Sequence, residues 1–240
     1  MIRSPDEPMQ ISEIYKSLQG ESTHAGLPCV FVRLTGCNLR CDWCDSEFSF
    51  SGGRRMSVEA VAAEVERLNP RGVGAQSSLV EITGGEPMLQ EREVIALMER
   101  LLAAGYKVLL ETSGERPLGQ VPKQVIKIVD VKCPHSGEAD TFAMENLDAF
   151  EPHDEVKFVL SDRADYEFAR DFVRQHHLAE RVFAVLFSPA FRKDASGARD
   201  TSHCLLDPER LAEWMLADHI PVRLSLQMHK LIWDPAAKGV

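Results

Sequence analysis

The stretch "VRLTGCNLRCDWCDSEF", Val32–Phe48, holds three cysteines within eight residues, at the spacing C-x3-C-x2-C. The apolar run Val30–Leu34 leads into it, is rich in β-branched residues and predicts a buried strand. The cysteines then stand in a polar loop at the carboxyl end of that strand, which disfavours buried structural thiols. A structural zinc site is closed by four ligands, so this set is one ligand short.

Cys29 is the nearest candidate for a fourth ligand, but the predicted strand separates it from the loop. At about 3.3 Å per residue, Cys29 should lie about 15 Å or more away, at the opposite end of the strand. Three thiolates instead suit a [4Fe–4S] cluster whose fourth iron is left for a substrate or cofactor. We therefore expect the cluster ligands to be Cys37, Cys41 and Cys44. The remaining cysteines, Cys133 and Cys204, are expected to be buried small hydrophobes.

The bulk properties narrow the function classes. Of the 240 residues, 44% are apolar and 27% are charged, as in an ordinary globular protein. No run of about 18 apolar residues occurs, and "MIRSPDEPMQ" has no apolar segment. We therefore expect a cytoplasmic protein with neither a membrane partner nor a secretory signal. A net charge of -10 argues against a nucleic-acid partner, because such binding depends on Lys and Arg neutralising phosphates.

Strand-like and helix-like patterns alternate along the rest of the chain. Apolar strand-like runs follow at Leu79–Thr83, Val108–Thr112, Val125–Val131, Val156–Leu160, Val182–Phe187 and Val222–Leu226. Helical patterns occur at Val58–Leu68, Glu91–Ala104, Tyr166–His177 and Glu209–Ala217, with Ser57 as an N-cap and Gly105 as a C-terminal stop. Such alternation implies parallel strands with right-handed crossovers. The sequence predicts a single α/β domain over residues 1–240, a partial (open) β/α barrel of about six parallel strands.

Polar or glycine-rich segments follow several of these strands. They are "TGCNLRC", "TGGEP", "ETSG", "DVKCPHS" and "SPAF". In folds of this class, ligands bind at the carboxyl ends of the parallel strands. Each segment alone is a weak signal, but their shared position predicts one site on one face.

The cysteine spacing, with Trp43 before the last cysteine and "GGEP" after the second strand, resembles the radical S-adenosylmethionine (SAM) enzymes. The resemblance implies that the open iron binds the amine and carboxylate of SAM. Reduction then cleaves a C–S bond and releases a 5′-deoxyadenosyl radical. Glycines allow a close backbone approach to the methionine moiety, and the Glu86 carboxylate is expected to help meet its ammonium. The implied cofactor contacts are Trp43, Asp45, Gly84, Gly85, Glu86, Ser113, Lys132, Ser136 and Ser188. For each of the last four, a loop or cap hydrogen bond is an equally supported interpretation.

A longer stretch of the sequence resembles one particular family of these enzymes. "IYKSLQGESTHAGLPCVFVRLTGCNLRCDWCDS" resembles the 7-carboxy-7-deazaguanine synthase family almost continuously, and "LVEITGGEPMLQ", "VDVKCPHSG", "VLFSPAF" and "LSLQMHKLIW" extend the match. The resemblance implies a lyase of queuosine biosynthesis that contracts the ring of 6-carboxy-5,6,7,8-tetrahydropterin to 7-carboxy-7-deazaguanine, losing ammonia and regenerating SAM. It implies substrate contacts from Leu18, Gln19, Gly20, Glu21, Arg33, Thr83, Gln227 and His229, with Arg33 pairing with the pterin carboxylate.

The family more often has Thr after Cys-Asp, where the hydroxyl is a ligand of Mg²⁺. Ser46 keeps that oxygen, and Mg²⁺ usually adds waters and substrate oxygens to few protein ligands. The resemblance also implies a homodimer and a reducing partner such as flavodoxin. Two alternatives remain: a glycyl-radical activase, which acts on a protein, and a non-enzymatic iron–sulfur or zinc module. The segment "SLQGE", Arg33 and Ser46 favour a small anionic substrate.

Overall fold

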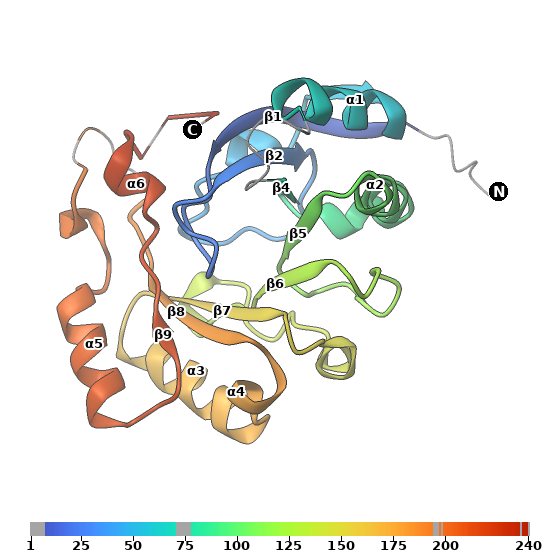
Figure 1. Ribbon diagram of the computed structural model, residues 1–240. Coiled ribbons are helices and arrows are strands. Elements are labelled where there is room, and N and C mark those ends of the chain that lie inside the picture. The colour runs from blue at the N-terminus through green and yellow to red at the C-terminus, as the bar shows by residue number, and fades with distance from the viewer. Residues whose placement is uncertain (1–7, 71–77, 194–196, 198, 236, 240) are drawn as a thin grey trace.

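The computed structural model describes residues 8–70, 78–193, 197, 199–235 and 237–239. Its strands form one nine-stranded sheet in the order β3-β1-β2-β4-β5-β6-β7-β8-β9. The strands are β1 (Met9–Leu18), β2 (Pro28–Leu34), β3 (Arg54–Met56), β4 (Leu79–Gly84), β5 (Lys107–Thr112), β6 (Ile126–Asp130), β7 (Glu155–Leu160), β8 (Ala184–Pro189) and β9 (Arg223–Leu224). Figure 1 shows the sheet curving round without closing. The strand order places β3 and β9 at its two edges. The predicted open α/β barrel is confirmed.

The parallel part of the sheet runs from β2 through β4, β5, β6, β7 and β8 to the short β9. Each of the seven strand-like runs in the sequence corresponds to one of these strands, so the parallel part has one strand more than the expected six or so. Two strands were not predicted, β1 and β3, which extend the sheet by antiparallel pairing. The sequence does not predict β1, because polar, partly buried residues interrupt its apolar ones and no apolar run results.

The helices are α1 (Val58–Leu68), α2 (Glu91–Ala103), α3 (Arg163–Gln175), α4 (Leu178–Arg181), α5 (Pro208–Ala217) and α6 (His229–Ile232). The predicted cap of α1 is confirmed, since the Ser57 hydroxyl accepts the Ala60 N–H at 3.2 Å. α2 ends before Gly105, whose φ of +83° suits glycine. α3 begins earlier than predicted because Asp162 caps it, accepting the Asp165 N–H at 3.0 Å.

Helices α1, α2, α3 and α5 lie on the outer side of the curved sheet (Figure 1), and the main apolar core fills the space between helices and strands. A second apolar cluster lies inside the barrel and consists of Cys29, Phe31, Leu79, Leu109, Ile126 and Ile128. Cys29 pairs with Leu79 at the start of β2, so this cluster forms a floor at the amino-terminal ends of the strands. Among the described residues, no helix combines the length and apolarity needed to cross a bilayer.

Candidate functional site

A cavity inside the barrel brings together most of the predicted site residues. Those lining it are Leu18, Gln19, Gly20, Glu21, Arg33, Cys37, Cys41, Trp43, Cys44, Asp45, Ser46, Thr83, Gly84, Gly85, Ser113, Lys132, Gln227 and His229. Three predicted residues, Glu86, Ser136 and Ser188, are outside this lining and are buried behind it. The strand-end segments therefore do converge on one place.

The cysteine loop after β2 places its three thiols at the cavity, each partly buried. The Asp42 N–H donates to the Ser136 carbonyl at 2.9 Å, which ties the loop to the segment after β6, and the Arg40 guanidinium donates to the Cys37 carbonyl at 2.8 Å within the loop itself. Burial raises the pKa of all three thiols, so the free thiols keep their protons near neutral pH. An all-sulfur donor set of three, facing one cavity, fits an iron–sulfur cluster with one open position.

The other cysteines lie away from this loop. Cys29 is fully buried in the barrel floor, at the opposite end of β2 from the cysteine loop. Cys133 packs in the main core, and Cys204 is buried where its backbone pairs with Phe191. The structure therefore brings three thiols together and leaves Cys29 apart, as the length of the strand predicts.

Gly84 and Gly85 let the turn after β4 approach the end of β2. A Cβ on Gly85 would lie 2.4 Å from the Gly36 oxygen and 2.6 Å from the Cys37 Cβ. A Cβ on Gly84 would lie 2.7 Å from the Leu34 oxygen. The glycines were predicted to admit a ligand, and the structure adds a second reason for them, because no side chain fits between these two chain segments.

Glu86 braces two strand-end turns. Its Oε1 accepts the Thr112 hydroxyl at 2.7 Å and the Met88 N–H at 3.0 Å. Its Oε2 accepts the Ser113 N–H at 2.8 Å and the Ser113 hydroxyl at 2.6 Å. With four hydrogen bonds and 1% exposure, this carboxylate has little capacity left for the ammonium of SAM. Its position instead supports a role in joining the turns after β4 and β5.

The four later strand-end residues divide into two pairs. Ser113 and Lys132 face the cavity, and Lys132 pairs with Asp130 at 2.8 Å. The buried Ser136 hydroxyl donates to the Cys133 carbonyl at 2.6 Å, which fits the alternative of a loop hydrogen bond. The Ser188 hydroxyl is buried and has no hydrogen-bond partner among the described residues.

The segment Leu18–Glu21 reaches the cavity from the opposite face of the barrel. Because β1 is antiparallel to β2, the hairpin loop 19–27 lies at the amino-terminal ends of the parallel strands. From there the Gln19 amide donates to the Glu81 carboxylate, and the Thr23 N–H donates to Glu155, the first residue of β7, at 3.0 Å. This loop closes the cavity from below.

Charged residues fill the middle of the barrel. Lys157 lies 2.7 Å from Glu21 and 2.5 Å from Glu111. Burial alone would raise the pKa of Glu21, but the Lys157 ammonium lowers it to about 2. Burial, together with Glu111 and Glu21, raises the pKa of Glu81 well above its usual range. The cavity therefore holds an ionised carboxylate and a protonated one side by side.

The segment after β9 covers the open side of the barrel. The Met228 N–H donates to the Gly20 carbonyl at 2.8 Å, and the Gln227 amide donates to Glu21 at 2.9 Å. A Cβ on Gly20 would lie 2.3 Å from His229 Nδ1, so the two segments touch directly. Burial lowers the pKa of His229, which is therefore neutral at pH 7. Gln227 and His229, which the family resemblance implies as substrate contacts, both line the cavity.

Arg33 lines the cavity but already has partners. Its Nε donates to Glu13 at 2.9 Å, and a terminal nitrogen donates to the Tyr15 hydroxyl at 3.1 Å. A guanidinium has five donors, so these two contacts leave others for a ligand carboxylate. The ion pair and a substrate contact are compatible.

Ser46 begins a hydrogen-bonded series. Its hydroxyl donates to Asp45 Oδ1 at 2.8 Å, and Asp45 Oδ2 pairs with Lys230 at 2.7 Å. Partial loss of solvent would by itself raise the pKa of Asp45, whose side chain is 41% exposed, but the Lys230 ammonium holds that pKa well below its usual range. Lys230 also donates to the side-chain amide oxygen of Gln227, Oε1, at 2.9 Å.

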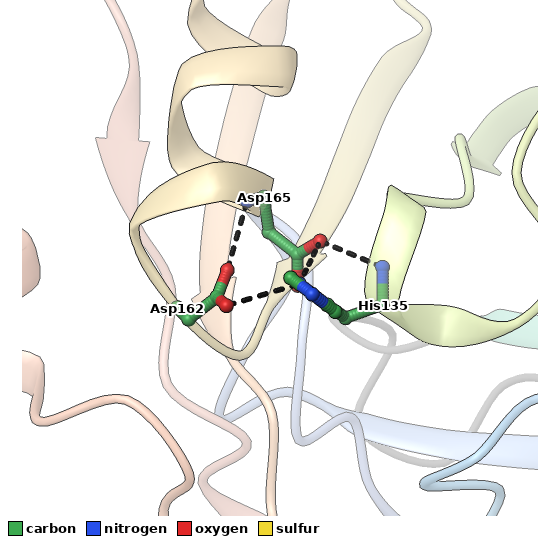
Figure 2. Close-up of side chains that lie close together, drawn as sticks. All are labelled: His135, Asp162 and Asp165. Carbon is green, nitrogen blue, oxygen red and sulfur yellow. Dashed lines mark hydrogen bonds and ion pairs between the residues drawn. The ribbon is translucent and has the colours of Figure 1, made fainter.

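A second group of possible metal ligands, His135, Asp162 and Asp165, lies outside the cavity lining (Figure 2). Its ligand atoms lie within 4.8 Å of one another. However, Asp165 already accepts the His135 N–H at 2.9 Å and, through its other oxygen, the Ser161 N–H at 2.9 Å. These carboxylates satisfy backbone donors and tie the loop after β6 to the start of α3.

Several cavity residues were not predicted. Among them are Tyr15, Phe31, Glu81, Glu111, Asp130, Lys157 and Lys230. A signal for two of them exists in "LVEIT" and "VKFVL", where a single charged residue interrupts an apolar strand. Buried Lys and Glu are rare unless paired, so such positions deserve to be read as candidates for a polar site.

Comparison with known families and proteins gives one consistent result. The radical SAM superfamily matches residues 31–171. A protein of Koribacter versatilis named 7-carboxy-7-deazaguanine synthase is 66% identical over 232 residues, covering 97% of this chain and 100% of the relative. A protein of Chlorobaculum tepidum with the same name is 38% identical over 244 residues, covering 99% of this chain and 100% of the relative.

Among solved structures, QueE from Escherichia coli matches with a TM-score of 0.68 at 22% identity, covering 92% of this chain and 95% of that one. A radical SAM methyltransferase from Sphaerobacter thermophilus matches with a TM-score of 0.54 at 16% identity, covering 86% of this chain and 68% of that one. At these identities the two structures establish the fold alone, and both support the open barrel.

Proposed function

The chain belongs to the radical SAM superfamily and, within it, to the 7-carboxy-7-deazaguanine synthase family, and on this basis we propose that it contracts the ring of 6-carboxy-5,6,7,8-tetrahydropterin to 7-carboxy-7-deazaguanine with loss of ammonia. The observation that carries the proposal is the shared cavity. Three cysteine thiols and the polar side chains expected around a pterin line the same space, with the apolar floor below them.

We propose that Cys37, Cys41 and Cys44 hold a [4Fe–4S] cluster. Trp43, Asp45, Gly84, Gly85, Ser113 and Lys132 would surround SAM, because they line the cavity next to these thiols. When bound, the cluster and SAM supply the 5′-deoxyadenosyl radical that starts the ring contraction. Glu86 does not line the cavity, and its role would be to fix the turns that carry Gly85 and Ser113 through its four hydrogen bonds. Ser136 acts likewise, because its carbonyl accepts the Asp42 N–H of the cysteine loop.

The pterin would lie among the charged residues in the middle of the barrel. A pterin ring presents both hydrogen-bond donors and acceptors along its edge. An ionised carboxylate such as Glu21 only accepts, whereas a protonated Glu81 and the Gln19 amide can donate as well. Leu18, Gly20, Thr83, Gln227 and His229 would complete this pocket, and Arg33 would bind the pterin carboxylate with its remaining donors.

Ser46 would contribute its hydroxyl oxygen to Mg²⁺. One serine makes a poor site by itself, but Mg²⁺ commonly combines one or two protein oxygens with waters and substrate oxygens. Ser46 lines the same cavity as the pterin residues, which supports a metal shared between protein and substrate.

The decisive experiment is anaerobic cluster reconstitution followed by product analysis with the carboxy-tetrahydropterin, SAM, Mg²⁺ and a reductant. The proposal requires 7-carboxy-7-deazaguanine together with unconsumed SAM. SAM cleavage without pterin conversion, but with a radical on an added protein substrate, would favour the activase alternative. No SAM cleavage by reduced protein would favour a simple iron–sulfur module.

Further expectations rest on the family resemblance. They are a reducing partner such as flavodoxin, a homodimer and a cytoplasmic location. We also propose that residues 1–240 form one domain, because the strands of the described residues all belong to one sheet. Size-exclusion chromatography with light scattering tests the dimer.

A further inference from the structure

Lys230 is a buried cation between two parts of the site. Its side chain is 5% exposed, and its Nζ lies 2.7 Å from Asp45 Oδ2 and 2.9 Å from Oε1, the side-chain amide oxygen of Gln227. The same Nζ lies 5.1 Å from the centre of the Phe191 ring. Burying an ammonium costs free energy unless it is paired and hydrogen-bonded, and here these contacts fix it in one place.

Two hydrogen-bonded series start at this ammonium. In one direction Asp45 accepts the Ser46 hydroxyl, at 2.8 Å. In the other direction the Gln227 amide donates to Glu21, at 2.9 Å. Lys230 therefore joins the residue proposed for Mg²⁺ to a residue proposed for the pterin, through one intermediate side chain on each side.

The direction of the Ser46 hydrogen bond matters for metal binding. A hydroxyl has one proton and two lone pairs, and a cation needs a lone pair. Because the Ser46 hydroxyl uses its proton in the hydrogen bond to Asp45, both lone pairs of its oxygen remain available to a metal. Carboxylates are themselves ligands of Mg²⁺. The Lys230 ammonium neutralises Asp45 and keeps its second oxygen engaged.

We propose that Lys230 is a positioning residue that orients Ser46 through Asp45 and Glu21 through Gln227, so that the metal site and the pterin pocket form together. This inference rests on the proposed function. It assigns a role to Lys230, which is proposed as a ligand of neither the metal nor the pterin. It predicts that loss of the ammonium weakens the binding of metal and of pterin at the same time.

The test compares Lys230→Met with Lys193→Met in cluster-reconstituted protein. Lys193 is a matched control. It also pairs with an acidic residue beside Ser46, Glu47, at 2.5 Å, but its side chain is about half exposed and is therefore not a buried cation. Mn²⁺ replaces Mg²⁺ and is titrated by electron paramagnetic resonance, with the carboxy-tetrahydropterin present and no reductant, so that no turnover occurs. Pterin affinity is measured separately by calorimetry.

We expect Lys230→Met to bind Mn²⁺ roughly tenfold or more weakly, as is typical when a residue supporting a metal ligand is lost. Pterin affinity should fall as well, whereas Lys193→Met should match the unmodified protein in both titrations. Asp45→Asn should reproduce the loss of Mn²⁺ affinity, and combining it with Lys230→Met should add little, because both changes act on the same contact.

Other results would overturn the inference. Unchanged Mn²⁺ and pterin affinities in Lys230→Met, or equal losses in Lys193→Met, exclude a positioning role. If the unmodified protein binds no Mn²⁺, the proposed metal site fails, and the pterin titration of Lys230→Met still decides the role of Lys230. If Lys230→Met does not retain its cluster, the Asp45→Asn titration decides, and normal Mn²⁺ binding there excludes the route through Asp45.

Discussion

Glu21 and Lys157 form a 2.7 Å ion pair inside the barrel, although they lie 136 residues apart in the chain. Glu21 comes from the hairpin loop below the sheet and Lys157 from the middle of β7. Lys157 also pairs with Glu111 on β5, so one cation holds a loop and two strands in register. The polar interior is therefore a structural element as well as a binding surface, and its charges cannot be changed independently.

The cysteine loop provides the first prediction. Cys37→Ala, Cys41→Ala and Cys44→Ala should each abolish cluster binding and activity, because each removes one of three ligands. Cys29→Ala should keep the cluster and lose only about 1 kcal/mol of stability from a small buried void. Iron content and visible absorbance after reconstitution measure the outcome, and loss of the cluster in Cys29→Ala would revive a site with four thiolates.

Two variants separate the proposed binding of the pterin carboxylate by Arg33 from its ion pair with Glu13. Arg33→Lys should raise the KM for the pterin about tenfold or more, because a charge-assisted hydrogen bond contributes about 1.5–3 kcal/mol and Lys is no bidentate donor. Glu13→Gln is the control, since it removes the ion pair while keeping the guanidinium. Equal rises of KM in both variants would mean that Arg33 serves only the Glu13 pair.

Ser46 should determine the response to Mg²⁺. Ser46→Thr keeps the oxygen and should retain most of the Mg²⁺ stimulation of turnover. Ser46→Ala removes the oxygen and Ser46→Cys substitutes a soft sulfur that Mg²⁺ disfavours, so both should lose it. Rates with Mg²⁺ and with a chelator give the comparison. A Ser46→Ala enzyme that responds like the unmodified one would show that Ser46 is not a ligand of Mg²⁺.

Glu81 should make stability depend on pH. In the folded protein it keeps its proton at pH values where the unfolded chain, with a pKa near 4.5, has lost it. Folding then takes up a proton, so this site lowers stability as the pH rises above that value. Glu81→Gln is neutral throughout and should gain stability relative to the unmodified protein by up to about 1.4 kcal/mol per pH unit. Thermal unfolding between pH 6 and 9 tests this, and a constant difference would mean that Glu81 is ionised.

Gly20 should not tolerate a side chain. Gly20→Ala would place a methyl group against the His229 ring, which must move to accommodate it. We expect a higher KM for the pterin with the cluster intact. Gly119→Ala is the control, because its Cβ would meet no atom within 4 Å. Unchanged kinetics in Gly20→Ala would show that the packing of His229 against the loop is dispensable.

The parallel core of the fold was predictable because each buried strand reads as an apolar run. The antiparallel β1 was not, since its alternation is masked by polar residues that are half buried. The cysteine ligands were predictable because the spacing is local and the strand length excludes Cys29. The contacts of Glu86 were not predictable for a different reason: nothing local shows that Thr112 and Ser113, at the end of another strand, donate to its carboxylate.

Lys157 and Lys230 were missed for the same physical reason. The single charge in "VKFVL" marks Lys157 as unusual, but the role of a buried lysine is defined by its partners, and these partners come from distant elements. The family resemblance supplied the loop Leu18–Glu21, but it gave no indication that the loop enters from the amino-terminal face of the barrel. That placement follows only from the antiparallel pairing of β1 with β2.

The contact between Gln227 and Glu21 spans 206 positions of the chain, nearly its full length. Contacts of such long range form only after the intervening chain has become compact, because closing a large loop costs entropy that local contacts do not recover. The barrel strands can pair with their sequence neighbours earlier, through the short βα crossovers. We therefore expect folding to complete the binding cavity late, when the hairpin loop 19–27 meets the segment that carries Gln227, so that a partly folded chain has strands before it has a site.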